Sequence, residues 1–374
     1  HSRIVSPTGR VLAEAGETAD TAVRATVATS QASYHVPRAG AGTPSLAAFW
    51  QEGLDILRAG NPEFYSSTAA TAPAEKQDWR RRLAQPSPEF TQMPFWFWND
   101  RLSDDEIKRQ MADFREHGVY GFVIHHRMGL PKDMPYMGEQ WLHFVQTAVE
   151  EAARTNMRVC LYDEAMYPSG SAHGEVVKFN PAFAAQGLAV AVRDVTGPSK
   201  IAKPSAADAG YVATVLGKRT GGKDALDPDS LRLLDTQPGP IDVPAGDWRV
   251  MTFTQVPSQG QIRGVFEGEE ENEPGAPKAA DLLNPEAMQT FIRLAYEPYY
   301  HRLKEHYGRC IIGVFTDEPS MLGRRPLRGL KPWTGGFAAY FERKRGYSPL
   351  ALLPGLFFDI GGKTNAIRQD YELA

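Results

Sequence analysis

The most regular feature of the sequence is an alternation between short, uniformly apolar runs and longer segments with an apolar residue at every third or fourth position. Uniformly apolar runs are typical of parallel strands buried on both faces, and the segments between them have the periodicity of amphipathic helices. Local signals delimit these helices: Ser103 and Glu106 form a capping box, and Gly118 follows the last turn. Strands are therefore expected at residues 95–98, 120–124, 158–162 and 310–315, and helices at 103–117, 139–154, 284–303 and 335–344.

The order of these elements predicts an α/β fold, specifically the first half of a (β/α)8 TIM barrel in residues 91–374. Short alternating strands between Pro and Gly turns, such as those at 187–192 and 248–254, interrupt the pattern and predict a β-rich insertion at about 186–270. Four strands are half the number that closes such a barrel. The final residues, 368–374, read as the beginning of a further helix. We therefore expect this chain to be a fragment of a longer protein.

Residues 1–66 have a different pattern and predict a small β-rich fragment. Runs at 2–5 and 10–14 flank a Pro-Thr-Gly turn, which predicts a β-hairpin, and a third strand is expected at 22–27. The motif SRIVSPTGRVLA resembles the C-terminal end of the nitrilase (carbon–nitrogen hydrolase) superfamily, although none of that family's catalytic Glu, Lys or Cys motifs is present. A plain structural hairpin module is the alternative. Residues 67–90 are rich in Ala, Pro and Ser and predict a linker with a short basic helix.

The composition argues against some classes of function but does not identify one. The chain has 374 residues, a net charge of −4 and no basic stripe, which argues against a nucleic-acid partner. No apolar run approaches the roughly 20 residues of a membrane-spanning helix. Seven Trp, 14 Tyr and 18 Phe suit a protein that stacks sugar rings, although a large core uses the same residues. The two cysteines, Cys160 and Cys310, lie within predicted strands and are expected to be buried free thiols.

Polar residues follow each predicted strand, and in a (β/α) barrel this edge of the sheet carries the active site. The strongest candidate is Glu318, which follows a strand of small and β-branched residues and precedes Pro319, so that an extended backbone is expected. Glycoside hydrolysis requires two rigidly held carboxyl groups, which come from different strands. The alternative is a structural role for Glu318, as a helix N-cap or as the ion-pair partner of Arg324 or Arg325.

Two further carboxyl groups end the third strand. Asp163 and Glu164 could bind sugar hydroxyls, or they could hold the following loop through the amides of Ser169 and Gly170. The acidic segment 267–273 is expected to be solvated surface.

The remaining strand ends supply candidate contacts for a saccharide. His125 and His126 are adjacent on a strand and must point to opposite faces, which argues against a shared metal ion and for one sugar contact and one packed histidine. Trp98 is either a stacking platform or a core residue, and Asp317 is expected to support Glu318. The predicted substrate contacts are Trp98, Asn99, His125, His126, Tyr162, Asp163, Glu164, Tyr167 and Asp317.

Five motifs resemble the barrel of large bacterial glycoside hydrolases related to the α-L-rhamnosidase family 106. They occur in the family's order, and the resemblance implies that Glu318 is a catalytic residue: the general base if the enzyme inverts configuration, or the acid/base if it retains it. A second catalytic Glu would come from a later strand, to which no residue here corresponds, so this chain is expected to be inactive by itself. The motifs are PFWFWN (94–99), GFVIHHR (121–127), LYDEAMYPSG (161–170), DLLNP (281–285) and GVFTDEP (313–319).

The same resemblance implies hydrolysis of O-glycosidic bonds in plant or microbial polysaccharides, with α-L-rhamnosides among the candidates. It also implies a calcium ion near the sugar, for which no ligands can be assigned in this sequence; no other cofactor is expected. It favours a periplasmic or secreted location over a cytoplasmic one. Two alternatives stay open: a carbon–nitrogen hydrolase fusion, suggested by residues 1–66, and a non-catalytic carbohydrate-binding barrel.

Overall fold

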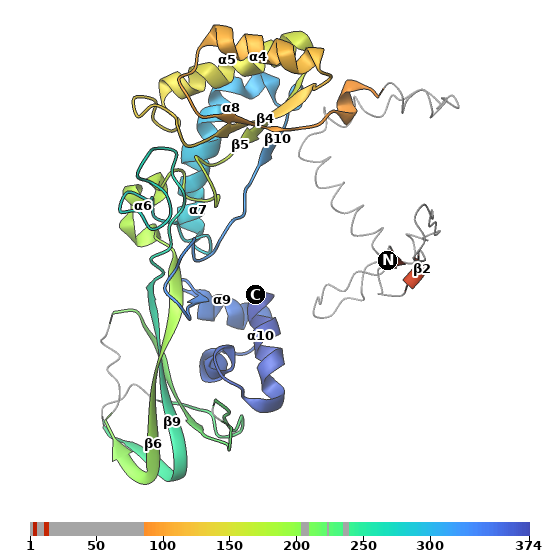
Figure 1. Ribbon diagram of the computed structural model, residues 1–374. Coiled ribbons are helices and arrows are strands. Elements are labelled where there is room, and N and C mark those ends of the chain that lie inside the picture. Colours follow the sequence, from red (N-terminus) through yellow and green to blue (C-terminus); the bar gives the residue numbers. More distant parts are fainter. Residues whose placement is uncertain (1–2, 6–10, 15–85, 203–208, 223, 235–238) are drawn as a thin grey trace. The chain divides into compact units, whose positions relative to one another are not determined.

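The computed structural model describes residues 3–5, 11–14, 86–202, 209–222, 224–234 and 239–374 (Figure 1). The chain separates into two compact units, residues 1–84 and 85–374.

The predicted hairpin of the first unit is confirmed. Strand β1 (Arg3–Val5) pairs antiparallel with β2 (Val11–Glu14). The third strand expected at 22–27, and the linker helix as far as residue 85, lie outside the described residues. The assignment of residues 1–66 to a nitrilase-like module stays a prediction.

The second unit contains a sheet of four parallel strands among its described residues, in the order β10-β5-β4-β3 (Figure 1). Strands that are consecutive in the predicted pattern are therefore neighbours in the sheet. Their carboxyl ends meet at one edge, because Trp98 is in register with His126, and Phe315 with Tyr162. The elements are β3 (Phe95–Trp98), α4 (Asp104–Glu116), β4 (Gly121–His126), α5 (Glu139–Thr155), β5 (Arg158–Tyr162) and β10 (Ile311–Phe315).

The two faces of this sheet differ. On β3, Trp96 and Trp98 are 7% and 2% exposed and belong to the core that α4 and α5 cover, whereas Phe95 and Phe97 on the other face are 40% and 45% exposed. Parallel sheets are normally covered on both faces. Among the described residues the sheet is open, and a closed barrel is not formed.

The helical segment before β10 is less regular than the continuous helix that its sequence predicts. Asn284 caps it as expected, since its side chain accepts hydrogen bonds from the amides of Glu286 and Ala287. A π-turn at Ile292–Tyr296 then interrupts the α-helix and shifts its face, as inserted π-turns do. The segment therefore consists of α7 (Pro285–Phe291), the π-turn and α8 (Glu297–Leu303) rather than one continuous helix.

The β-rich insertion is also present, but its strands are much longer than expected. Strands β6 and β9 have 16 and 17 residues, because the Gly-Pro pair at 197–198 produces a register shift rather than ending β6. The antiparallel sheet has the order β11-β6-β9-β7-β8. Its strands are β6 (Gln186–Ile201), β7 (Tyr211–Lys218), β8 (Arg232–Leu233), β9 (Ile241–Pro257) and β11 (Lys331–Pro332).

The last helices share a core with this second sheet, in which Phe253, Trp333 and Phe341 are buried together. Gly346 (φ +81°) ends α9 as a left-handed C-cap, and the final helix begins four residues before the position expected. The remaining elements are α6 (Glu175–Phe179), α9 (Phe337–Arg345), α10 (Thr364–Glu372) and short 3-10 turns at Pro88–Phe90, Pro181–Phe183, Lys304–His306, Leu350–Leu356 and Gly361–Lys363.

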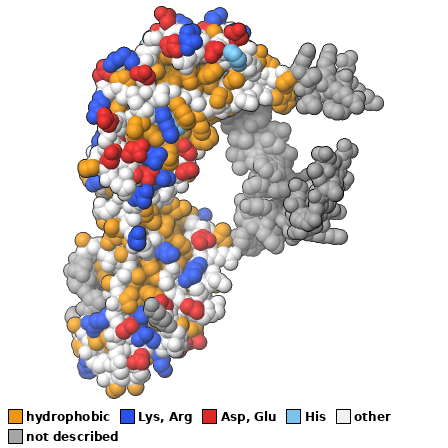
Figure 2. All heavy atoms as spheres, in the orientation of Figure 1, with side chains coloured by type: hydrophobic (Ala, Val, Ile, Leu, Met, Phe, Trp, Pro, Cys, Tyr) orange, Lys and Arg blue, Asp and Glu red, His pale blue; other side chains and the backbone are white. Residues whose placement is uncertain are grey.

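Charged side chains of both signs are interspersed over the face drawn in Figure 2. No helix in the described ranges combines the length and the apolar character needed to cross a membrane.

Candidate functional site

The carboxyl ends of β5 and β10 are joined by hydrogen bonds to Asp163. This side chain is 1% exposed; its Oδ1 accepts from Ser169 Oγ at 2.6 Å, and its Oδ2 accepts from Thr316 Oγ1 at 2.7 Å and Tyr296 Oη at 2.8 Å. Ser169 also exchanges two 2.8 Å hydrogen bonds with the backbone of Asp317. Asp163 therefore ties the loops after both strands together, and its carboxylate oxygens face protein hydroxyls.

Glu164 is fully buried and holds the loop that follows β5. Its carboxylate accepts hydrogen bonds from the amides of Ala165 (2.9 Å), Ser171 (2.8 Å), Ala172 (2.8 Å) and His173 (2.5 Å). Burial raises the pKa of Glu164 to about 7, while the four N–H groups oppose the shift because they favour the charged form. The loop-fixing alternative thus accounts for Glu164, through amides 171–173 rather than those of Ser169 and Gly170.

The two histidines of β4 point to opposite faces, as expected. His125 is 2% exposed and lies within an aromatic cluster on the open face, 4.0 Å from the ring of Tyr162 and about 5 Å from those of Phe95 and Phe97. His126 is 1% exposed and stacks on Trp141 of α5 at 3.4 Å. Neither side chain is open to a ligand in this structure.

Burial lowers the pKa of His125 to about 4, which predicts a pH-dependent stability. Below about pH 6.5 the His125 side chain binds a proton in the unfolded state but not in the folded state. The free energy of unfolding therefore decreases as pH falls from 6.5 to 4. The full effect is about 3 kcal/mol, at 1.4 kcal/mol per pKa unit. We expect the stability of wild type relative to His125→Gln to fall by this order between pH 7 and pH 4 in urea denaturation. A constant difference over that range would contradict the buried neutral state.

Trp98 belongs to the core rather than to the surface. It is 2% exposed and packs edge-on against Trp96 and Trp141, at 5.2 Å and 5.1 Å between ring centroids. The structure therefore agrees with the interpretation of Trp98 as a core residue and not with that of a stacking platform. Asn99, the next residue, is exposed beyond the end of β3.

Asp317 and Tyr162 form a pair at the rim. The Tyr162 hydroxyl donates to Asp317 Oδ2 at 2.6 Å, and the Tyr162 ring stacks at 6.0 Å on Phe315. Asp317 thus lies beside the aromatic cluster, one residue before Glu318, and its supporting role stays a prediction.

Glu318 lies in the loop after β10, and 67% of its side chain is exposed. It lines a pocket of about 360 Å³ together with Pro168, Glu271, Ser320, Gly323, Arg324 and Arg325. Its Oε2 lies 3.7 Å from Arg324 Nη1, the ion pair that the structural alternative anticipated. The expected extended backbone is wrong: Glu318 has a φ of +43°. A non-glycine residue in this region carries strain, which occurs most often at functional sites.

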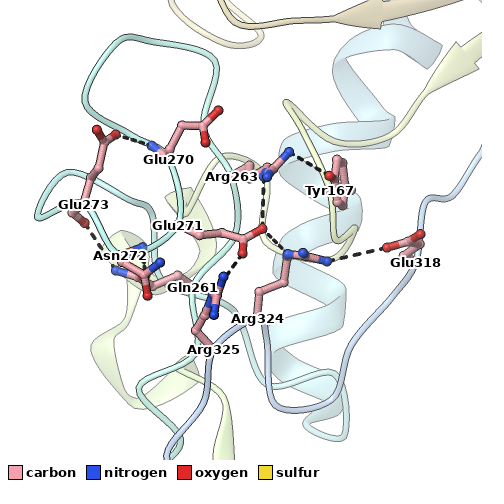
Figure 3. A network of polar contacts seen from close by, with 10 residues as sticks. All are labelled: Tyr167, Gln261, Arg263, Glu270, Glu271, Asn272, Glu273, Glu318, Arg324 and Arg325. Carbon is pink, nitrogen blue, oxygen red and sulfur yellow. Dashed lines mark hydrogen bonds and ion pairs between the residues drawn. The ribbon is translucent and has the colours of Figure 1, made fainter.

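One residue that lines this pocket, Glu271, is not among the site residues predicted from the sequence. Glu271 comes from the acidic segment expected to be solvated, yet only 7% of its side chain is exposed, and it contacts Arg263, Arg324 and Arg325 (Figure 3). The expectation of a solvated segment is therefore wrong for Glu271. Tyr167, a predicted contact, joins this cluster, since Arg263 Nη1 donates to its hydroxyl at 2.8 Å.

Close backbone packing holds the Arg324 loop in place. Arg324 and Gln261 exchange backbone hydrogen bonds of 2.8 and 2.9 Å, and the Ser258 hydroxyl donates to the Leu322 carbonyl at 2.8 Å. A Cβ at Gly260 would lie 1.8 Å from the carbonyl oxygen of Leu322, so only glycine permits this approach.

The rim carboxylates do not fit the calcium ion implied by the resemblance. Asp163 and Glu164 are occupied by protein donors, and no group of three or more His, Cys, Asp or Glu in the described residues is arranged to hold a metal ion. We therefore assign no role to a metal.

Both cysteines are free, as expected, but only Cys310 is buried, whereas Cys160 is partly exposed. Burial raises the pKa of Cys160 to about 11 and that of Cys310 above its usual range, so neither forms a reactive thiolate at neutral pH.

Comparison with known proteins gives a similarity of fold. No protein-family model matches the sequence, and no curated protein matches it. The structure of a rhamnosidase from Novosphingobium sp. PP1Y is similar, with a TM-score of 0.53 and 14% sequence identity over 80% of this chain and 44% of that one. The chain thus spans less than half the length of that protein. The described residues therefore share part of the fold of that rhamnosidase. The comparison supports neither membership of family 106 nor the nitrilase resemblance.

Proposed function

We propose that this chain carries one catalytic carboxylate of a glycoside hydrolase, and that Glu318 is that residue. The observation that carries the proposal is its position: an exposed carboxylate beyond the carboxyl end of a parallel strand, beside a pocket. Active sites of (β/α) folds form at this edge. The fold similarity to a rhamnosidase makes α-L-rhamnosides the first substrates to test.

The supporting residues act on the loop that carries Glu318. Asp163 holds Thr316, and Ser169 and Tyr162 hold Asp317, so the two residues before Glu318 are anchored. A catalytic carboxyl group must stay in register with the scissile bond throughout the reaction. Tyr167, in the neighbouring cluster, and the exposed Asn99 are the predicted contacts that a saccharide could reach without a change in packing.

The second carboxyl group of the proposed mechanism comes from sequence beyond the described residues. The sheet has four described strands, and its open face exposes Phe95, Phe97 and Phe315, side chains that further strands of a barrel would cover. In the complete enzyme the two carboxyl groups would lie about 5–5.5 Å apart for a retaining mechanism or about 6.5–9.5 Å for an inverting one.

The test is Glu318→Gln in the longest natural form of the protein, assayed on aryl α-L-rhamnosides and other aryl glycosides. We expect kcat to fall about 100-fold, as it does when general acid–base catalysis is removed. Stability should change by less than about 0.5 kcal/mol because the side chain is exposed.

The matched control is Glu267→Gln, an exposed Glu with no part in the pocket, which should retain full turnover. Unchanged turnover in Glu318→Gln would refute a catalytic role for Glu318, and no turnover by wild type would favour the non-catalytic carbohydrate-binding barrel.

A further inference from the structure

The pocket beside Glu318 is lined by two arginines and two carboxylates, and a third arginine, Arg263, contacts Glu271 from outside that lining. Glu271 contacts three guanidinium groups: Arg263 Nε at 3.0 Å, Arg325 Nε at 3.4 Å, and Arg324 Nε. Glu318 adds one further carboxylate, 3.7 Å from Arg324. In this cluster, Arg263 included, three positive charges therefore face two negative ones, although a single arginine would neutralise Glu271.

Two of these guanidinium groups are held rigidly before any ligand binds. Arg263 donates to the Tyr167 hydroxyl, and the guanidinium carbons of Arg263 and Arg324 each lie 5.2 Å from the centroid of the Tyr167 ring (Figure 3). The backbone pair between Gln261 and Arg324 fixes the position from which Arg324 extends. Charged donors that are already ordered lose little entropy on binding.

The third guanidinium, that of Arg325, is the most exposed of the three. Arg325 is 64% exposed, and its only ion pair within the described part of the chain is the Nε contact to Glu271. Its terminal nitrogens are therefore open to the pocket that Glu318 also lines. A guanidinium fork matches a planar oxyanion and forms two parallel hydrogen bonds with it. The hydroxyl groups of a neutral sugar need no such excess charge.

We propose that this pocket selects an acidic saccharide, whose anionic substituent binds Arg325 and Arg324 next to the scissile bond. The substituent is the carboxylate of a uronic acid or a sulfate ester, which share the oxyanion edge that a guanidinium recognises. This inference rests on the proposed function for the saccharide nature of the ligand.

The test measures equilibrium binding by titration calorimetry at fixed ionic strength, so that it does not depend on turnover. The probes are trigalacturonate, neutral galactotriose and a sulfated galactotriose. We expect wild type to bind an acidic probe about tenfold more tightly than the neutral one, the gain of one charge-assisted hydrogen bond. Arg325→Ala should abolish that preference. A preference for the sulfated probe alone would support the anion site and assign it to sulfate; a preference for trigalacturonate alone would assign it to a carboxylate.

The control is Arg328→Ala, which removes the same charge from an exposed position of the same loop outside the pocket and should keep the preference. Equal binding of acidic and neutral probes by wild type would overturn the proposal. So would an equal loss in both variants, because a general surface charge would then explain the binding. Loss of the preference only in Arg325→Ala, together with unchanged turnover in Glu318→Gln, would keep the anion site and refute the proposed catalytic role.

Discussion

Replacing Glu164 by Ala is expected to destabilise the second unit by about 4–5 kcal/mol, the largest effect predicted here. The substitution leaves four backbone N–H groups without their acceptor in a site with no exposed surface, and a buried unpaired donor costs about 1–3 kcal/mol. The total lies below the sum of four donors because water entering the space can bind some of the amides. Urea denaturation followed by tryptophan fluorescence measures the loss.

Two further variants test whether the loss of stability is specific to the buried carboxylate of Glu164. Glu175→Ala removes a partly exposed Glu paired with Lys178 at 2.6 Å and should cost less than about 1 kcal/mol. Glu164→Gln keeps one acceptor oxygen but turns an NH2 group toward the other amides, so it should fall between wild type and Glu164→Ala. If Glu164→Ala loses no more than Glu175→Ala, the carboxylate does not hold the loop.

The main elements of the fold could be predicted because their signals are local. The capping box at Ser103 forms, with the side chain accepting from the Glu106 amide, and each of the four apolar runs becomes a strand of the parallel sheet. The opposite orientations of His125 and His126 follow from strand geometry alone. The prediction failed where tertiary contacts outweighed a local rule. A Gly-Pro pair usually ends a strand, but in β6 it produces only a register shift.

The candidate site could be predicted only in part. Strand ends pointed to Asp163, Glu164, Asp317 and Glu318, because parallel strands bring their carboxyl ends to one edge. Glu271 could not be found in this way, since its partner Arg324 lies 53 residues away and a run of acidic residues is typical of solvated surface. No local pattern distinguishes the one Glu in such a run that becomes buried among arginines.

The hydrogen bonds of Asp163 explain how this buried carboxylate can determine the position of the exposed carboxylate of Glu318. Asp163 is 1% exposed, and it fixes Thr316 two residues before Glu318. The φ of +43° at Glu318 is maintained only if the surrounding loop is over-determined by such contacts. A change at Asp163 should therefore affect both stability and turnover.

Replacing Asp163 by Ala is accordingly expected to destabilise the unit by about 3 kcal/mol, because one buried and two part-buried hydrogen bonds lose their acceptor. It should also lower kcat by about ten- to hundredfold at temperatures where the protein stays folded, since a displacement of about 1 Å in a catalytic group has an effect of this size. The control is Asp281→Ala, which removes another 1% exposed carboxylate, bonded to Thr334 at 2.6 Å, and should lose stability without losing turnover. Equal turnover in both folded variants would show that Asp163 stabilises the fold without positioning Glu318.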